Sequence, residues 1–392
     1  MATAPKIRLD DCCEIVAGAT PSTSDESCWG GDIHWATPKD LSELDTAFIS
    51  GTPRRLTHKG LESCAAKILP VGSVLFSSRA PIGHVAINTV PMATNQGFKS
   101  FIPDSSQVFA KYLYWWLKSN RAYLESLGNG ATFKEVSKSI VSKIEIPLPP
   151  LAEQKRIAEV LDKAEELRVK RRAALAQLDS LTQSIFLEMF GDPVTNPKKI
   201  KVVRLAEVST RITDGVHQKP DYTESGVPFI SVKDITTGKL IFDHCKFISE
   251  DDHKRFTKRC KPERNDILYT KVGATYGRPA IVETDREFSL YVSVCIIKPR
   301  KELIDPNFLN AALGTSALKN QADRRIKGIG VPDLHLDQIQ NFLIPLPLMS
   351  QQHEFALRVA AVEKLKATQR TSLAELDTLF VSLQHRAFRG EL

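Results

Sequence analysis

Basic, amide and hydroxyl side chains lie beside glycines and prolines in two separate parts of this chain. Arg, Lys, Asn and Gln can hydrogen-bond base edges in the DNA major groove, whereas Ser, Thr, Lys and loop N–H groups suit phosphates. These residue types therefore indicate contact with nucleic acid. In the first part the DNA-contact candidates are Thr20, Ser22, Lys39, Arg79, Gln96, Lys99 and Lys134. In the second part they are His217, Lys219, Lys233, Lys271, Tyr276, Arg278, Arg324 and Lys327.

The charge balance is compatible with such a partner. The 392 residues carry a formal net charge of +7, and the sequence pI is near 8.9. A moderately basic chain permits nucleic-acid binding without requiring it. With 42 % hydrophobic and 25 % charged residues, the composition is that of an ordinary globular protein with two or three domains.

Motifs that would carry catalysis are missing from the sequence. It contains no G-x-x-x-x-G-K-[ST] phosphate loop, no H-E-x-x-H metal helix and no G-x-S-x-G elbow. It also lacks the N-P-P-[YF] tetrapeptide of adenine methyltransferases. Asp251-Asp252-His253 is the one acidic–histidine cluster, and its highly charged surroundings favour a solvated surface over a metal site. We therefore expect no catalytic residue, no metal site and no cofactor bound by this chain.

Cysteine usage and hydropathy predict a location in the cytoplasm. The seven cysteines are odd in number and form no C-x-x-C pair, which argues against a disulfide framework and a structural zinc site. No uncharged apolar run reaches the length of about 18 residues that a transmembrane helix needs. The N-terminal segment also lacks the pattern of a secretory signal.

The chain repeats itself with a long period. Residues 146–154 read IPLPPLAEQ, and residues 344–352, exactly 198 positions later, read IPLPLMSQQ. The same offset relates Leu178-Asp179 to Leu376-Asp377, while earlier matches are looser. A period of this length indicates a duplicated unit made of one lobe and one long helix, in which the lobes have diverged more than the helices.

Residues 151–190 and 347–388 are the two long helices of this duplication. Apolar residues at alternating spacings of four and three predict a coiled-coil seam, broken at Arg171 in the first helix. Two helices with such seams would pair antiparallel in a unit of pseudo-two-fold symmetry, although each could instead pack on its own lobe. The predicted helix-pairing residues are Val160, Ala164, Leu167, Ala174, Leu178, Leu181, Ile185, Val362, Leu365, Leu376, Leu379 and Leu383.

The lobes read as compact α/β units. Residues 71–76 and 266–270 have the pattern of buried strands, and residues 112–117 and 308–313 that of short amphipathic helices. The Tyr and Trp side chains at 112–116 could stack on bases, but their helical spacing favours core packing. The predicted fold is two globular α/β domains separated by two long antiparallel helices. The predicted boundaries are 1–145, 146–191, 192–343 and 344–392.

The sequence resembles the DNA-specificity subunit of type I restriction–modification systems. The similarity covers essentially the whole chain. It is carried by residues 146–157 (IPLPPLAEQKRI) running into a long helix, by residues 188–192 (EMFGD), by Gly215-x-His217-x-x-Pro220 and by residues 266–277 (DILYTKVGATYG).

This resemblance implies a non-catalytic role in sequence recognition. Each lobe would read one half of a bipartite target in double-stranded DNA, and the helices would fix the gap between the halves. The expected protein partners are two modification (methyltransferase) subunits, together with restriction/translocase subunits. S-adenosylmethionine, ATP and Mg would belong to those partners, and no membrane would be involved.

The second half departs from the family pattern. Residues 348–353 read LMSQQH in place of the fuller PLAEQK form, and the second seam carries Arg358, Gln369 and Ser372. The two helices would then differ in how tightly they hold their partners. Two other functions stay open from the residues alone: an enzyme with unrecognised motifs, and a coiled-coil scaffold whose lobes bind proteins.

Overall fold

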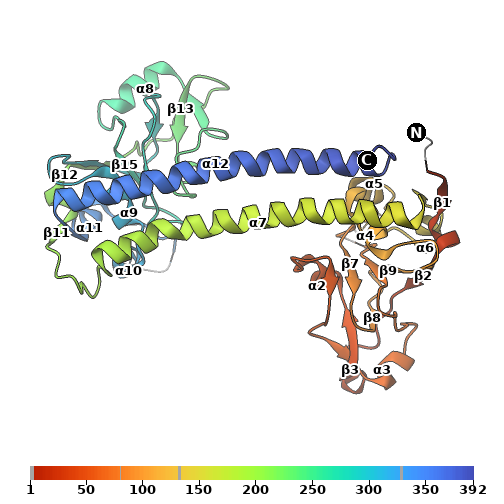
Figure 1. The fold of residues 1–392 in the computed structure, drawn as a ribbon. Coiled ribbons are helices and arrows are strands. Elements are labelled where there is room, and N and C mark those ends of the chain that lie inside the picture. Colours follow the sequence, from red (N-terminus) through yellow and green to blue (C-terminus); the bar gives the residue numbers. More distant parts are fainter. Residues whose placement is uncertain (1–3, 80, 131–133, 327–329) are drawn as a thin grey trace. The chain divides into compact units, whose positions relative to one another are not determined.

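The computed structural model describes residues 4–79, 81–130, 134–326 and 330–392, which form two compact units. Unit 1 comprises Met1–Arg172 with Ser372–Leu392, and unit 2 comprises Ala173–Thr371. The division runs through both long helices, α7 (Leu151–Phe190) and α12 (Met349–Ala387). Each unit therefore holds one lobe together with one end of each long helix (Figure 1).

Three small sheets build the lobe of unit 1. Their strand orders are β2-β9-β6-β7-β4, β5-β3-β8 and β1-β10. The strands are β1 (Lys6–Arg8), β2 (Cys13–Ala17), β3 (Trp29–Ala36), β4 (Phe48–Ile49), β5 (Arg55–Leu56), β6 (Val74–Phe76), β7 (Val85–Asn88), β8 (Met92–Thr94), β9 (Lys99–Pro103) and β10 (Glu145–Pro147). The helices are α1 (Leu9–Cys12), the 3₁₀ turn η1 (Glu26–Cys28), α2 (Pro38–Ser42), α3 (His58–Glu62), α4 (Ala110–Ser119), α5 (Arg121–Ser126) and α6 (Lys138–Ser142).

The lobe of unit 2 follows the same plan. Its sheets have the orders β12-β18-β15-β16, β14-β13-β17 and β11-β19. The strands are β11 (Val202–Arg204), β12 (Ser209–Asp214), β13 (Val227–Ile230), β14 (Lys246–Ile248), β15 (Ile267–Thr270), β16 (Pro279–Ile281), β17 (Ser289–Leu290), β18 (Val294–Pro299) and β19 (Leu343–Pro345). The helices and 3₁₀ turns are η2 (Leu205–Val208), η3 (Val232–Asp234), α8 (Glu250–Thr257), α9 (Pro306–Leu313), α10 (Ser316–Asp323) and α11 (Leu336–Gln340).

The duplication is confirmed by strand register. In unit 1, β1 pairs antiparallel with β10 through Ile7 and Ile146, and in unit 2, β11 pairs antiparallel with β19 through Val203 and Ile344. The central sheets also correspond strand for strand, β2-β9-β6-β7 to β12-β18-β15-β16. The mixed α/β fold and the internal repeat are therefore as the sequence predicts.

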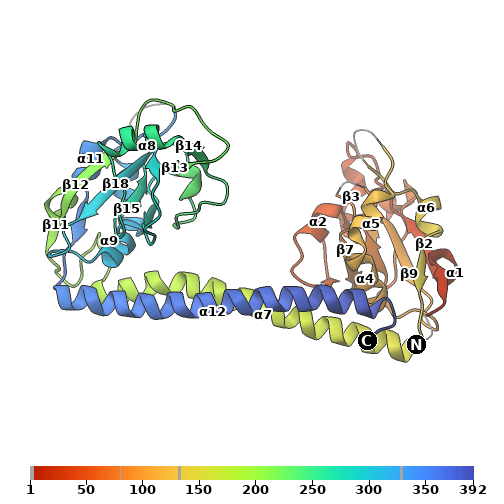
Figure 2. The ribbon, with the colours of Figure 1, turned by 90° about the horizontal axis from the view of Figure 1, so that it is seen from above.

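In each lobe one helix links the central sheet to the long helices. The aromatic helix α4 is core: Trp115 is buried, donates from Nε1 to Asp162 Oδ1 at 3.0 Å and lies 5.6 Å from the Phe380 ring. In unit 2, α9 occupies the corresponding place (Figure 2), where Phe308 stacks against Phe186 at 5.6 Å. Burial thus settles the choice between a base-stacking platform and core packing in favour of the core.

Within each unit the ends of α7 and α12 run antiparallel. In unit 1, Arg168 bonds Asp377 and Arg156 bonds the carbonyl of Leu392. In unit 2, Lys366 pairs with Asp179 at 3.2 Å, and positions later on α12 therefore meet earlier ones on α7. The two helices pair with each other and pack on the lobes as well.

Four of the twelve predicted helix-pairing residues are exposed rather than buried. Ala164, Leu178, Ile185, Val362, Leu376 and Leu383 are buried or half-buried as predicted, but Leu167 and Leu365 are 54 % and 52 % exposed, and Leu181 and Leu379 are exposed too. Val160 and Ala174 are half-buried, beside positions 161 and 175. The neighbouring positions are buried or half-buried instead: Leu161, Arg168, Leu175 and Thr182 on α7, and Lys366 and Phe380 on α12.

The physical reason is the amphipathic character of Arg168 and Lys366. Their aliphatic stems lie at these buried or half-buried positions, while their charged ends bond carboxylates on the facing helix. Leu167 and Leu365, one position earlier, satisfy the same apolar spacing. The spacing therefore predicted that these leucines, and not Arg168 and Lys366, are buried.

Three further predictions concern membrane helices, cysteine pairing and metal sites. The described residues contain no helix long and apolar enough to cross a membrane. All seven cysteines are free thiols. Among the described residues, no group of three His, Cys, Asp or Glu side chains is placed to hold a metal ion.

Candidate nucleic-acid interface

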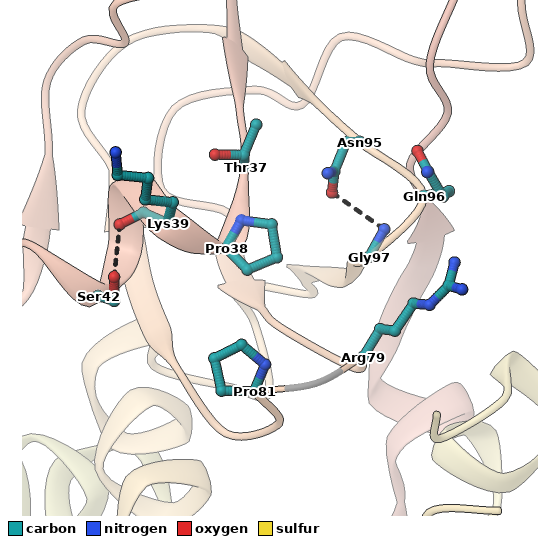
Figure 3. A pocket seen from close by; sticks show the side chains of 9 residues that line it. All are labelled: Thr37, Pro38, Lys39, Ser42, Arg79, Pro81, Asn95, Gln96 and Gly97. Carbon is teal, nitrogen blue, oxygen red and sulfur yellow. Dashed lines mark hydrogen bonds between the residues drawn. The ribbon is translucent and has the colours of Figure 1, made fainter. Parts of the chain in front are cut away.

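An open hollow of about 540 Å³ in the lobe of unit 1 gathers several of the predicted DNA contacts. Figure 3 shows Lys39 and Arg79 extending from opposite sides of it, with Gln96 on the same side as Arg79. All three side chains are exposed. The full lining is Thr37, Pro38, Lys39, Ser42, Arg79, Pro81, Asn95, Gln96 and Gly97.

A capped turn after β3 sets the position of Lys39. The backbone N and Oγ1 of Thr37 both donate to Asp40 Oδ2 at 2.7 Å, and Pro38 begins α2 with its preset backbone angle. The Lys39 ammonium projects to solvent, 3.7 Å from the exposed carboxylate of Glu43. An exposed pair of this kind is weak, so a phosphate can replace the carboxylate.

Two tryptophans hold the loop that carries Thr20 and Ser22. Trp35 Nε1 donates to Ala19 O at 3.0 Å, and Trp29 Nε1 donates to Ser22 O at 3.1 Å. The Arg54 guanidinium lies 3.8 Å from the Trp29 ring centroid and 4.8 Å from that of Trp35. Sequence reasoning missed this stack, because Trp29, Trp35 and Arg54 become neighbours only when β3 folds.

The loop then joins the rim of the hollow. Thr20 Oγ1 donates to Gln96 Oε1, which leaves the Gln96 amide nitrogen to face outward partners. Ser22 Oγ pairs with Ser24 Oγ at 3.0 Å and is exposed, as is Lys134. Thr20, Lys39, Arg79 and Gln96 are thus brought together, whereas Ser22 and Lys134 lie outside the hollow.

The lobe of unit 2 repeats the capped turn. Ser231 N and Oγ donate to Asp234 Oδ2 at 2.8 and 3.0 Å, which presents Lys233 to solvent as Asp40 presents Lys39. Lys39 and Lys233 are therefore equivalent, exposed cations in the two lobes.

A buried carboxylate organises the other cations of unit 2. Asp214 accepts from Arg259 Nη2 at 2.7 Å and lies 3.4 Å from His217 Nε2 and 3.8 Å from Lys271 Nζ. His217 and Arg259 are exposed on their outer sides. Sequence reasoning missed Asp214 and Arg259, since their segments are far apart in the chain and neither belongs to a recognisable motif.

The remaining candidates of unit 2 lie in several places. Tyr276 OH donates to Asp323 Oδ1 at 2.5 Å, beneath Lys319, whose Nζ lies 3.4 Å from the Tyr276 ring centroid. Hydrogen bonds from Lys319 and Tyr276 lower the pKa of the Asp323 carboxyl. Arg278 is exposed and donates to Thr236 O. Lys219 and Arg324 are exposed, and Lys327 lies outside the described residues.

Two predicted contacts are buried rather than exposed. The side chain of Lys99 is 9 % exposed and that of Lys271 is 6 % exposed, and each ammonium pairs with a carboxylate. Their burial does not support a direct contact with DNA. Both lysines were predicted to contact DNA because of their residue type, which carries no information about exposure.

Comparison with known proteins identifies the family of this fold. A family described as "Type I restriction modification DNA specificity domain" matches residues 3–177 and again residues 197–378. The chain belongs to this family. Its two matches fall on the two halves of the duplication, so each copy of the repeat contains one specificity domain.

Curated relatives agree along most of the chain. The type I restriction enzyme MjaIX specificity subunit of Methanocaldococcus jannaschii is 31 % identical, over 88 % of this chain and 84 % of the relative. The EcoBI specificity subunit of Escherichia coli is 28 % identical, over 77 % of this chain and 70 % of the relative. This chain is accordingly a specificity subunit of the type I restriction–modification class.

Solved structures share the fold. One, from work on complex assembly and conformational transition of the type I R-M system, matches 100 % of this chain and 99 % of that one, with a TM-score of 0.66 at 20 % identity. The type I restriction–modification S subunit of M. genitalium matches 98 % of this chain and 96 % of that one, with a TM-score of 0.56 at 16 % identity. The fold predicted for a specificity subunit is thereby confirmed.

Proposed function

We propose that each lobe of this specificity subunit reads one half of a bipartite site in double-stranded DNA, and that the chain itself catalyses no reaction. The observation that carries the proposal is the equivalence of Lys39 and Lys233, which stand exposed on the same capped turn in both lobes. Equivalent lysines suit the phosphate backbone, which is the same at every sequence.

The surroundings of the two turns differ, as reading different half-sites requires. Lobe 1 offers Arg79 and Gln96 around an open hollow, whereas lobe 2 offers His217 and Arg259 around a buried carboxylate. Arginine pairs with guanine and the amide of glutamine with adenine in the major groove. Different sets of such groups give different base preferences.

The outer faces of the long helices are the proposed docking surfaces for two modification subunits. Leu167 and Leu365 are equivalent in the repeat and similarly exposed, as are Leu181 and Leu379. Equivalent apolar positions on the two helices suit two copies of one partner. We further propose that the long helices fix the unread gap, and that restriction/translocase subunits join the complex.

The partner subunits would carry the chemistry. S-adenosylmethionine, ATP and Mg belong on the modification and restriction subunits in this proposal, and the specificity subunit contributes recognition and assembly. The setting would be cytoplasmic, where the free thiols of this chain stay reduced.

Genome-wide mapping of adenine methylation tests the proposed function. The map is made with the gene for this chain intact and again with it deleted. A two-part motif with a fixed gap that disappears on deletion is the expected result, and it also supplies the target sequence. Should methylation stay unchanged, binding of the chain with its modification subunit to DNA is measured directly, and absence of any sequence preference overturns the proposal.

A further inference from the structure

In each lobe a buried lysine pairs with a carboxylate, and the two carboxylates lie at corresponding positions of the repeat. In lobe 1, Lys99 on β9 pairs with Glu135 at 3.1 Å between Nζ and Oε1. In lobe 2, Lys271, directly after β15, pairs with Asp333 at 3.2 Å between Nζ and Oδ1. Both carboxylates are partly exposed, whereas both ammonium groups are buried.

Glu135 and Asp333 occupy the same place in the two lobes. Glu135 forms an antiparallel bridge with Arg79, and Asp333 forms the same kind of bridge with Val272. The residue after each carboxylate, Val136 or Leu334, donates its backbone N–H to Ser78 or Lys271 at 2.8 or 2.9 Å. The two acidic residues are therefore equivalent in backbone pairing as well as in sequence offset.

The two lysines, in contrast, come from different positions. Lys271 corresponds to Ser78 of lobe 1, because each donates its backbone N–H to the same neighbouring segment, at Ser293 and Gly97 respectively. Strand register pairs Val74 with Phe101 and Ile267 with Ile297, which makes Cys295 the counterpart of Lys99.

The duplication therefore did not simply copy one ion pair into both lobes. Each lobe holds a buried ammonium against the equivalent carboxylate, and the lysine comes from a different segment in each lobe. The same ion pair is thus formed in both lobes by lysines at different positions. This indicates that the carboxylate at this place needs a buried cation as its partner.

Stability alone is a poor reason for such pairs. Burying an ammonium group is costly, and its attraction to a partly exposed carboxylate returns only part of that cost. An apolar side chain in place of Lys99 would pack at lower cost, whereas Lys271 also lies 3.8 Å from the buried carboxylate of Asp214. What the pair with Glu135 or Asp333 does supply is a fixed position for the acidic segment.

We propose that Lys99 and Lys271 are positioning residues, which hold the acidic segment of each DNA-reading face in place. The inference rests on the proposed function. In lobe 1 the segment lies against Arg79 and is preceded by the exposed Lys134. In lobe 2 it lies against Val272, and Gly273 N donates to Pro332 O at 2.9 Å just before the carboxylate. Loss of the ion pair would release the segment from this position.

Salt dependence separates a positioning lysine from a phosphate contact. Each lysine that contacts a phosphate adds about 0.9 to the slope of log K against log salt concentration. A buried positioning lysine contributes nothing to this slope, yet its loss lowers discrimination between the target and random DNA.

The experiment uses the full chain assembled with its modification subunit and compares Lys99→Met with Lys134→Met. Lys134 is the matched control, since it is an exposed lysine adjacent to Glu135. Lys99→Met is expected to weaken binding to the target at least about tenfold, to leave binding to random DNA within about twofold and to keep the slope. Lys134→Met is expected to lower the slope by about one and to weaken binding to both DNAs alike.

Lobe 2 gives an independent copy of the test. Lys271→Met is compared with Lys219→Met, an exposed lysine of the same lobe. Each buried-lysine variant should lose discrimination at its own half-site only, and Glu135→Gln should reproduce the half-site effect of Lys99→Met. A thermal melt of each variant establishes that both lobes are folded.

Three outcomes overturn the inference while the proposed function stands. These are a slope lowered by Lys99→Met, equal loss at both half-sites, and unchanged discrimination in both buried-lysine variants. If the wild-type assembly itself does not distinguish the target from random DNA, the proposed function fails and the inference fails with it.

Discussion

Gln154 and Gln352 make the same three hydrogen bonds in the two halves of the molecule. Both side chains are buried at the start of a long helix. Gln154 Nε2 donates to the carbonyl oxygens of Gln107 and Pro149, each at 2.8 Å, and its Oε1 accepts from Phe109 N at 2.9 Å. One amide thereby fastens the helix to the segment that leads into α4.

In unit 2, Gln352 repeats this arrangement. Its Nε2 donates to Leu303 O at 3.3 Å and to Pro347 O at 2.9 Å, and its Oε1 accepts from Asp305 N at 2.8 Å. We predict that Gln154→Leu and Gln352→Leu each lower the free energy of unfolding by about 1–3 kcal/mol, because buried backbone groups lose their partners. Urea unfolding followed by circular dichroism measures this, with the exposed Gln177→Leu as the control. Equal stabilities for all three variants would contradict the role given to the amides.

The buried ammonium of Lys366 gives a prediction about asymmetry. Lys366 is 7 % exposed and pairs with Asp179 at 3.2 Å and Glu363 at 2.8 Å, whereas Asp179 is 64 % exposed. Removing the lysine leaves acids that water can solvate, so Lys366→Met should cost less than about 1 kcal/mol. Removing both acids strands a buried charge, and Asp179→Ala with Glu363→Ala should cost roughly 3 kcal/mol. Chemical unfolding measures the free energy of unfolding of both variants. A larger loss for Lys366→Met than for the double alanine variant would refute this account.

Acid should weaken unit 2 through Glu363. Burial acts to raise the pKa of this carboxyl, but hydrogen bonds from Lys366 and Lys239 outweigh it, and the pKa is lowered overall. A carboxyl with a lowered folded-state pKa stabilises the fold above its unfolded pKa of about 4.3, and this contribution disappears as pH falls through the folded value.

The corresponding measurement compares wild type with Glu363→Gln between pH 7 and pH 3. The difference in unfolding free energy should be constant near neutrality and should shrink below about pH 4. The exposed Glu354→Gln serves as the control and should show no such trend. A gap that widens on acidification would reverse the assigned sign.

Arg79 and Arg278 should each serve a single half-site. Arg79 lines the hollow of lobe 1, and Arg278 is exposed in lobe 2. Each alanine variant is expected to lose about 1–3 kcal/mol of discrimination at one half of the target only. Competition binding with targets mutated in one half at a time reports this. Equal losses at both halves would argue against one lobe reading one half.

The exposed leucines of the long helices should hold the modification subunits. Leu167→Glu with Leu365→Glu changes two side chains that are half exposed in the chain alone, so its melting temperature should be nearly unchanged. Burying a charge at an interface is costly, and co-purification of the modification subunit should fall by at least about tenfold. Leu348→Glu, exposed just before α12, is the comparison variant. Retained co-purification would place the docking surface elsewhere.

Long-period repetition predicted the architecture well because it depends only on order along the chain. The duplicated motif around residues 146 and 344 located both long helices, and their antiparallel pairing followed from symmetry. The predicted seam was wrong at Leu167 and Leu365, because apolar spacing could not show that the adjacent Arg168 and Lys366 bury their stems. It was also wrong at Leu181 and Leu379, which are exposed. Burial also distinguishes Lys99 from Lys134, which is exposed, although residue type alone made both of them candidates.

Side-chain clusters that join distant segments could not be predicted from the sequence. Asp214 meets Arg259 only because β12 and the end of α8 converge in the folded lobe. The Arg54 stack on Trp29 and Trp35 depends in the same way on the bulged pairing of β3 with β5. Neither cluster corresponds to a characteristic spacing of residues along the sequence.

The order in which this chain can fold during synthesis follows from how its cores are assembled. Unit 2 is one continuous stretch, Ala173–Thr371, whereas the core of unit 1 includes Phe380 and Ala387 from the far end of α12. Lobe 1 can therefore complete its core only after these residues, which follow all of unit 2 in the chain, have been made. Until Phe380 is made, the α4 surface that receives it stays open in nascent lobe 1, and an open apolar surface of this kind favours aggregation and chaperone binding.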